Sequence, residues 1–378
     1  MNSTNLIRPR ITLENIKPYK PGKPLWEVQK ELELDEVIKL ASNENPLGPS
    51  RMAIQAVSIS LTDINRYPDS HAVELKKTIA SKLVLSEDQL IVTNGADELI
   101  TLISETYLDS GDEIIVPSPS FSEYDFGAHL LGATVVPVKL RENFEFDIEG
   151  ILSAVSSRTK LIYVCSPNNP TGTYLPKDRL EELLNSLPKH VLVVFDSAYS
   201  HFATEEDYTD GLEYVRAGFP VMVLQTFSKV YGLAGLRIGF GVAPKEVIQS
   251  ILKVKEPFNV NTLAQTAAIV AIKDEEHVHR STENNTVVRK QLYDALSGLD
   301  IHYTESMANF VLVKIGPDAK FVYEQLLLKG VIVRYGDTWG MPDYIRISIG
   351  TEKENRELIE ALYTIVTGLK LANFRSNV

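Results

Sequence analysis

The sequence predicts an α/β fold: a mostly parallel sheet covered on both faces by helices, followed by a smaller α+β domain. Two features of the chain support this prediction. From about Leu90 onward, short apolar segments alternate with amphipathic helical segments, which is typical of a buried parallel sheet. After about Ala271, charged helical segments are interleaved with apolar strands. This second pattern indicates a separate α+β domain.

The expected elements follow in order along the chain. The opening segment contains Pro18, Pro21 and Pro24, and because proline disrupts a regular helix we expect an extended arm there. Apolar runs predict strands of the large sheet at residues 90–93, 113–116, 161–164, 191–195 and 221–224, and a helix at 96–108. Strands of the smaller domain are expected at residues 310–314, 331–334 and 344–348. We therefore expect an arm over residues 1–40 that packs with the small domain, a large domain over 41–271 and a small domain over 272–378.

The composition disfavours several classes of protein. The chain has 378 residues, of which 44% are hydrophobic, and a formal net charge of -12. It can bury a large core, but it is poorly suited to capture nucleic acid. No apolar run approaches the roughly 20 residues of a membrane helix, and the first residues lack the apolar stretch of a signal peptide. We therefore expect a cytoplasmic protein.

Two other features carry little functional weight. The single cysteine, Cys165, lies in an apolar strand and is expected to be a small core residue. His277 and His279 are two positions apart in a charged, helix-like stretch, so they should point to different faces and be solvated rather than bind a metal. No metal site is predicted.

Two of the segments that follow expected strands could bind an anion or hold an amide. In open parallel sheets, ligands bind beyond the carboxyl ends of the strands. Residues 93–98 contain Gly95 at the start of a helix, where free backbone N–H groups suit a phosphate, although Asn94 or Asp97 could simply cap that helix. Residues 166–172 contain two prolines and a glycine. They form either a plain turn or a rigid loop that presents an amide side chain.

Two further strand ends carry charged side chains. Asp196 ends an apolar strand, and a buried carboxylate needs a partner such as a protonated pyridine nitrogen, although a turn or cap role is equally compatible. Residues 225–240 contain Lys229 between Thr226, Ser228 and Arg237. A lysine shielded from water has a lowered pKa and can attack an aldehyde, and the neighbouring donors suit a phosphate. Most lysines, by contrast, are solvated surface groups.

Taken together, these segments resemble the fold-type I pyridoxal phosphate aminotransferases over nearly the whole chain. The motifs Asn-Pro-Thr-Gly at residues 169–172, Asp-x-Ala-Tyr at 196–199 and Ser-Lys at 228–229 occur in the family's order. Finer features at residues 18–24, 42–50, 65–69 and 233–237 are similar to the histidinol-phosphate aminotransferases. The resemblance implies a seven-stranded type of sheet in the large domain.

The resemblance implies a role for each matching residue. Lys229 would form a Schiff base with pyridoxal 5'-phosphate and serve as the base, while Asp196 would keep the pyridine nitrogen protonated. Tyr199 and Asn169 would hydrogen-bond the phenolic oxygen of the ring. Phe121 would stack on the ring, although many relatives carry a tyrosine there. Residues at two strand ends would surround the cofactor phosphate, namely Gly95, Ala96, Asp97, Thr226, Ser228 and Arg237.

The resemblance also implies a homodimer, because Tyr67 is expected to reach the cofactor phosphate from the neighbouring subunit. Arg346 would bind the carboxylate of the amino donor through two hydrogen bonds. Arg334 would bind a substrate phosphate, although it could equally be solvated or paired with nearby acids. Tyr19 in the arm and Asn45 are expected at the substrate site.

The activity implied is a two-step transfer of an amino group from L-histidinol phosphate to 2-oxoglutarate, a reaction of histidine biosynthesis. Three alternatives remain open at this stage: an aromatic amino-acid or dual-specificity aminotransferase, a threonine-phosphate decarboxylase, and a catalytically silent cofactor-binding regulator. If activity depends on Arg334, the histidinol-phosphate reaction is favoured over the first alternative, because only a phosphorylated substrate needs a second anion site.

Overall fold

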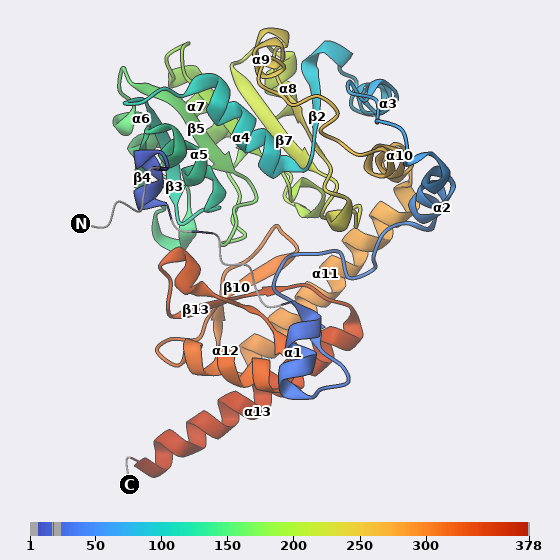
Figure 1. The fold of residues 1–378 in the computed structure, drawn as a ribbon. Helices are drawn as coiled ribbons and strands as arrows, with labels where there is room; N and C mark the ends of the chain where they lie inside the picture. Colours follow the sequence, from blue (N-terminus) through green and yellow to red (C-terminus); the bar gives the residue numbers. More distant parts are fainter. Residues whose placement is uncertain (1–6, 17, 19–23, 377–378) are drawn as a thin grey trace, which may run out of the picture.

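The computed structural model describes residues 7–16, 18 and 24–376, and Figure 1 shows a larger upper part and a smaller lower part. The upper part contains a seven-stranded sheet of β2 (Leu90–Thr93), β3 (Glu113–Ser118), β4 (Thr134–Lys139), β5 (Thr159–Cys165), β6 (Leu192–Asp196), β7 (Val221–Thr226) and β8 (Gly239–Val242). Their order is β2-β8-β7-β6-β5-β3-β4. Neighbouring strands are parallel, except that β8 runs antiparallel to both β2 and β7. The predicted mostly parallel α/β fold is confirmed.

Helices cover both faces of this sheet because successive strand residues point to opposite sides. Val193 and Phe195 of β6 face one core, while Leu192 and Val194 face the other. The first core is closed by α2 (Arg51–Ser60), α3 (Val73–Leu83), α6 (Ile148–Ala154), α7 (Lys177–Ser186), α8 (Leu212–Arg216) and α10 (Thr262–Ala271). The second core is closed by α4 (Ala96–Tyr107), α5 (Glu123–Leu131) and α9 (Lys245–Ile251).

The sequence did not predict β4 or β8. β4 lies at the edge of the sheet, where its side chains are exposed or half-buried, and Pro137 interrupts its run of valines. The four residues of β8 include two glycines, which carry no strand signal of their own. Gly239 is required here, since a Cβ atom would lie 2.8 Å from the backbone nitrogen of Ala96.

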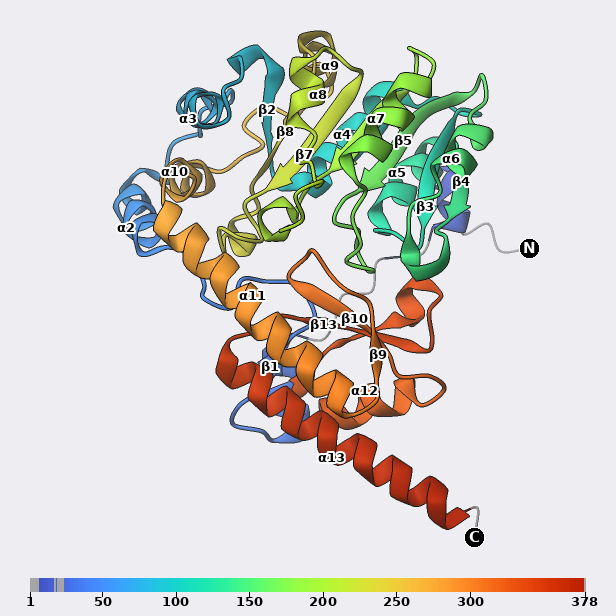
Figure 2. The ribbon, with the colours of Figure 1, turned by 180° about the vertical axis from the view of Figure 1, so that it is seen from behind.

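The lower part contains two smaller sheets. One is antiparallel, in the order β12-β13-β10-β9, and is built from β9 (His302–Tyr303), β10 (Phe310–Lys314), β12 (Arg334–Tyr335) and β13 (Tyr344–Ser348). The other is a parallel pair between β1 (Ile38–Lys39) and β11 (Val331–Ile332). Four helices complete this part: α1 (Leu25–Leu32), α11 (Glu275–Gly298), α12 (Ala319–Leu328) and α13 (Glu352–Ser376). Figure 2 shows α11 running from the upper part into the lower one.

Two expectations are corrected here. The single strand predicted at 331–334 is two strands, because β11 pairs with β1 whereas β12 pairs with β13. The prediction that both histidines are solvated is wrong for His277, which is 8% exposed because the first turn of α11 packs against the upper part. Burial lowers the pKa of His277. His279 is exposed and lies near Glu283.

Within residues 7–16, 18 and 24–376, no group of three or more His, Cys, Asp or Glu side chains is arranged to hold a metal ion. No helix in the same ranges has the length and apolar character needed to span a membrane.

Candidate active site

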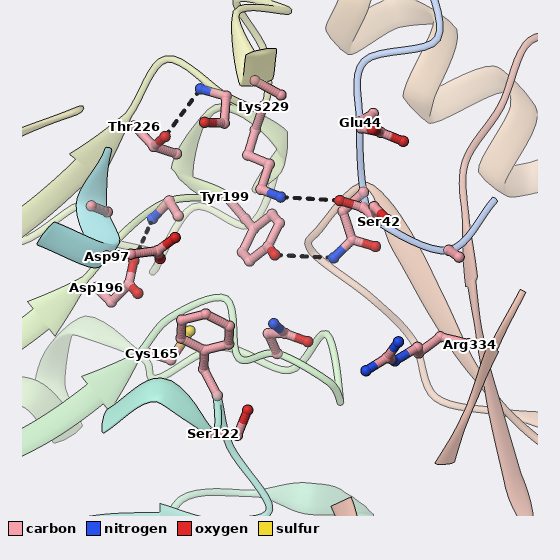
Figure 3. A pocket seen from close by; sticks show the side chains of 18 of the residues that line it. Ser42, Glu44, Asp97, Ser122, Cys165, Asp196, Tyr199, Thr226, Lys229 and Arg334 are labelled. Carbon is pink, nitrogen blue, oxygen red and sulfur yellow. Dashed lines mark hydrogen bonds between the residues drawn. The ribbon is translucent and has the colours of Figure 1, made fainter. Parts of the chain in front are cut away.

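A cavity of about 430 Å³ lies between the carboxyl ends of the large sheet and the lower part of the molecule. Figure 3 shows its residues converging from both parts. This is the edge at which parallel α/β sheets bind ligands. Its lining includes most of the residues selected from the sequence, namely Ala96, Asp97, Phe121, Asn169, Asp196, Tyr199, Thr226, Ser228, Lys229, Arg237, Arg334 and Arg346.

Lys229 follows β7 and points into the cavity, where its Nζ donates to the carbonyl of Ser42 at 3.3 Å (Figure 3). Nζ also lies 5.4 Å from the centre of the Tyr199 ring. Burial, together with the positive charge of Arg346, lowers the pKa of Lys229 to about 8. A substantial fraction of the amine is therefore neutral in mildly alkaline solution, as a nucleophile or base requires.

Asp196 ends β6 and is 5% exposed. Its Oδ2 accepts a hydrogen bond from the hydroxyl of Tyr124 at 2.7 Å, and its Oδ1 accepts from the backbone N–H of Ala198 at 3.0 Å. Burial raises the pKa of this carboxyl, and the Tyr124 hydrogen bond opposes that shift. The carboxyl lines the cavity opposite the side from which Arg334 approaches (Figure 3). It can therefore face a cationic group of a ligand.

Tyr199 and Asn169 lie on neighbouring loops of the cavity wall. The hydroxyl of Tyr199 accepts a hydrogen bond from the side-chain amide of Asn43 at 3.0 Å. The side-chain carbonyl of Asn169 accepts from the guanidinium of Arg346. Its amide nitrogen is then the group that can donate to a ligand.

The helix start at Gly95 and the loop after β7 meet at one end of the cavity. Gly95 has φ +84°, and a Cβ atom there would lie 2.6 Å from Nη2 of Arg237. The Arg237 guanidinium donates to Ser228 Oγ at 3.4 Å and to Asp97 at 3.1 Å. The hydroxyl of Thr226 accepts from the backbone N–H of Ser228 at 3.0 Å. Backbone N–H groups, two hydroxyls and a guanidinium are the donor set that a phosphate binds. No hydrogen bond from the side chain of Asn94 or Asp97 caps α4 in the described chain.

Two arginines form the opposite end of the cavity. Arg334 of β12 and Arg346 of β13 are direct partners across the antiparallel pair, so they leave the sheet on the same face. Arg346 is 5% exposed, and its guanidinium lies 5.1 Å from the Phe310 ring and 4.9 Å from the Trp339 ring. It also donates to the carbonyl of Ala41 at 2.7 Å. Two like charges held side by side favour the binding of an anion between them.

Three of the predicted residues that the structure describes do not line the cavity. Gly95 lies directly behind its lining, next to Ala96. Tyr67 is 82% exposed and stacks on Phe258 at the surface, with ring centres 4.8 Å apart. The amide of Asn45 donates to Val230 O and Ser281 Oγ, and its side-chain carbonyl accepts from the N–H of Leu47. These bonds hold the side chain away from the cavity, so the expected contact of Asn45 with substrate is not supported. Tyr19 lies outside the described residues.

Three residues that contact predicted site residues received no role from the sequence. Asn43 and Tyr124 hydrogen-bond the side chains of Tyr199 and Asp196, and Trp339 packs on Arg346. Asn43 lies within residues 42–50, which carried part of the family resemblance, and this was the available signal. Tyr124 lies three positions after Phe121, whose role the resemblance implied. Trp339 follows β12 in a short 3-10 helix and carried no such signal. Cys165 is buried as predicted, and its strand end also reaches the cavity wall.

Comparisons with known proteins agree with this geometry. The sequence profile of the family described as aminotransferase class I and II matches residues 35–362. The chain is 48% identical over 358 residues to the histidinol-phosphate aminotransferase of Moorella thermoacetica, covering 94% of this chain and 92% of that protein. It is 42% identical to that of Caldicellulosiruptor saccharolyticus, over 94% and 99% of the two chains. The crystal structure of the Sinorhizobium meliloti histidinol-phosphate aminotransferase in complex with pyridoxal-5'-phosphate has the same fold, with a TM-score of 0.89, 24% identity and coverage of 97% and 100%.

Proposed function

This chain belongs to the class I and II aminotransferase family, and from that membership we propose that it transfers the amino group of L-histidinol phosphate to 2-oxoglutarate. The products are imidazole-acetol phosphate and L-glutamate, and the reaction is a step of histidine biosynthesis. The cofactor is pyridoxal 5'-phosphate. The relatives named for this activity cover nearly the whole chain at 42–48% identity. Arg334 and Arg346, which leave the small sheet side by side, are the observation that carries the choice of substrate.

The residues of the cavity fit this cofactor. A Cβ atom at Gly95 would occupy space beside Arg237, so the helix start is open to a phosphate. In the same lining, Asp196 presents a buried carboxylate, which suits a protonated ring nitrogen. Lys229 presents an amine with a lowered pKa to the same cavity. When bound, the cofactor supplies an aldehyde carbon for an amine and a ring that withdraws electrons from the substrate's alpha carbon.

The side chains then divide the remaining work. Lys229 holds the cofactor in the resting enzyme and, once displaced by the substrate amine, moves a proton at the alpha carbon. Asp196 keeps the ring nitrogen charged. Tyr199 and the amide nitrogen of Asn169 orient the ring through its phenolic oxygen. Phe121 stacks on the ring, and this role needs no hydroxyl.

The phosphate-binding roles belong to the end of the cavity formed by Gly95, Ala96 and the loop after β7. Thr226, Ser228 and Arg237 supply hydroxyl and guanidinium donors there. Asp97 fixes Arg237 through their 3.1 Å ion pair. The acid thereby orients the guanidinium that meets the phosphate.

The substrate's own anion is assigned to Arg346 and Arg334. Arg346 forms a planar guanidinium site for a carboxylate or phosphate, held by stacking and by Asn169. Arg334 adds a second positive charge on the same face. A dianionic phosphate gains more from two guanidinium groups than a carboxylate does. This favours a phosphorylated donor over an aromatic amino acid.

The proposal also covers the domain division, the cellular location and the oligomeric state of the protein. The separate sheets support a division between a large domain (41–271) and a small domain (272–378). The pairing of β1 with β11 supports an arm (1–40) that packs with the small domain. A cytoplasmic location is proposed from the biosynthetic role. A homodimer is proposed because Tyr67, which is exposed in the single chain, would complete the phosphate site of its neighbour. Tyr19 of the arm would contact the substrate.

Turnover assays with 2-oxoglutarate as acceptor test the substrate. Histidinol phosphate should be converted efficiently, and Arg334→Gln should raise its KM at least about tenfold while leaving the KM for phenylalanine nearly unchanged. Turnover of phenylalanine and tyrosine but not of histidinol phosphate would refute the proposal that histidinol phosphate is the amino donor. Release of carbon dioxide from threonine phosphate, without any need for 2-oxoglutarate, would indicate a threonine-phosphate decarboxylase instead.

Two further experiments test the cofactor and the dimer. Borohydride should fix a yellow cofactor to Lys229, and retention of covalently reducible cofactor by Lys229→Ala would contradict that role. Mixing inactive Lys229→Ala and Tyr67→Ala chains should restore activity, because the mixed dimer contains one site with both residues. If activity stays absent although mixed dimers form, the contribution of Tyr67 across the interface is wrong.

A further inference from the structure

The short segment 40–43 joins the lower part of the molecule to the cavity. Its backbone is held by the small sheets: Leu40 donates to Ile332 O at 2.7 Å and accepts from the N–H of Ser348 at 2.8 Å. The backbone N–H of Asn43 donates to Ser348 Oγ at 2.9 Å, and its carbonyl accepts from Asn309 at 3.0 Å. The segment should therefore move with the small sheets as one unit.

The opposite side of this segment contacts the groups that perform chemistry. The carbonyl oxygen of Ala41 accepts a hydrogen bond from Arg346, and that of the next residue, Ser42, accepts one from Lys229. The third residue, Asn43, donates from Nδ2 to the hydroxyl of Tyr199. Asn43 is 1% exposed, so its amide is shielded from water and specific in its partners.

The direction of the hydrogen bond between Asn43 and Tyr199 is set by Ser348. The hydroxyl of Ser348 accepts the backbone N–H of Asn43 and donates to Asn43 Oδ1 at 2.8 Å. With Oδ1 occupied by Ser348, Nδ2 faces Tyr199, and an amide nitrogen can only donate. The phenol oxygen of Tyr199 is therefore an acceptor in this pair, and its own hydrogen is left to point into the cavity.

We propose that Asn43 is a positioning residue that makes Tyr199 a hydrogen-bond donor toward the cofactor, and that it does so from the small domain. This inference rests on the role of Tyr199 given under the proposed function. Asn43 does not itself touch the reacting atoms. It fixes the phenol hydrogen and couples the position of the small sheets to the strength of the Tyr199 contact.

The backbone at this position supports the choice of residue. Asn43 has φ +56°, a left-handed conformation that asparagine and glycine adopt more readily than other residues. Burial raises the pKa of Tyr199, and the hydrogen bond from Asn43 opposes that rise. Glycine can thus replace Asn43 without backbone strain, which gives a clean deletion of the amide.

The test measures the pH at which the visible absorption of the bound cofactor changes, a property that does not depend on turnover. A donor to the phenolic oxygen lowers that midpoint, so its loss raises it. Tyr199→Phe should raise the midpoint by about one pH unit, and Asn43→Gly by about half a unit. Asn43→Asp, which would accept from Tyr199 and reverse the bond, should raise it as well. Asn143→Gly is the matched control, because Asn143 is exposed and has φ +55°; it should leave the midpoint unchanged.

A double-mutant cycle separates positioning from a general structural effect. In the Tyr199→Phe background, Asn43→Gly should produce no further shift. A shift of equal size with and without the Tyr199 hydroxyl would overturn the inference, as would an unchanged midpoint in Asn43→Gly. If Asn43→Gly does not fold, the same cycle is run with Asn43→Asp. If Tyr199→Phe itself leaves the midpoint unchanged, the role of Tyr199 in the proposed function fails first, so the two failures are distinguishable.

Discussion

The hydrogen bond from Tyr124 to Asp196 should stabilise the ionised carboxylate, and Tyr124→Phe tests this. The hydroxyl of Tyr124 donates to Asp196 Oδ2 at 2.7 Å in a fully buried position. Removing it leaves the carboxylate with the N–H of Ala198, at 3.0 Å, as its other hydrogen-bond donor in the described chain. The phenylalanine ring can keep the stacking on Tyr163, whose centre is 4.5 Å away. The substitution therefore removes one donor with little loss of packing.

The magnitude follows from the charge on the acceptor. A hydrogen bond to a charged group contributes about 1.5–3 kcal/mol and one between neutral groups about 1 kcal/mol. The difference, about 0.5–2 kcal/mol, corresponds to a rise of about one unit in the pKa of Asp196. Burial already raises this pKa, and an acid with a raised pKa in the folded state loses stability as pH rises between its unfolded and folded values. Because Tyr124→Phe raises the pKa of Asp196 further, it extends this loss of stability to higher pH.

Urea unfolding of the cofactor-free chain measures the effect. The destabilisation by Tyr124→Phe should be larger at about pH 8 than at about pH 4 by about 0.5–2 kcal/mol. Tyr163→Phe is the control: it removes a hydroxyl from the same buried ring stack without touching Asp196, so its effect should not change between the two pH values. A destabilisation by Tyr124→Phe that is equal at both pH values would refute the reasoning.

Three other predictions concern the cofactor and anion sites. Gly239→Ala should weaken cofactor binding at least about tenfold in an absorbance titration, because the added Cβ would lie 2.8 Å from Ala96 N; Gly298→Ala, where a Cβ meets nothing within 4 Å, should bind normally. In the cofactor-free chain, acylation of Lys229 should accelerate as pH rises through about 8, because only the neutral amine reacts; a midpoint near that of an ordinary lysine would contradict the lowered pKa. Arg346→Lys should raise the KM for both amino donor and 2-oxo acid by about tenfold or more, and an unchanged KM for either would remove Arg346 from that site.

The residues at the strand ends could be predicted from the sequence for a definite reason. Parallel strands place their carboxyl ends at one edge of a sheet, so residues that follow apolar runs meet there. Asn169, Asp196 and Lys229 follow β5, β6 and β7, which are neighbours in the sheet. Apolar runs mark such strands strongly, and the local order of motifs is enough to bring these three side chains to one cavity.

Two strands of the large sheet, β4 and β8, were not predicted because proline or glycine interrupts their apolar residues. β4 lies at the sheet edge and β8 is rich in glycine, so neither has the hydrophobic pattern of a buried strand. The burial of His277 also escaped prediction. Spacing within a helix tells which face a side chain occupies, but it does not tell which neighbouring element covers that face.

The sequence alone therefore determined the fold class, the cavity's location at the strand ends and most of the side chains that line it, because periodicity and strand-end position are local properties of the chain. Only the tertiary structure decided the contacts between distant segments. The register of β12 against β13 sets Arg334 beside Arg346, and packing turns Asn45 away from the cavity while bringing Asn43 onto Tyr199. The contact between Asn43 and Tyr199 joins residues 156 positions apart in the sequence. Such contacts depend on the three-dimensional fit of whole elements, which no local pattern encodes.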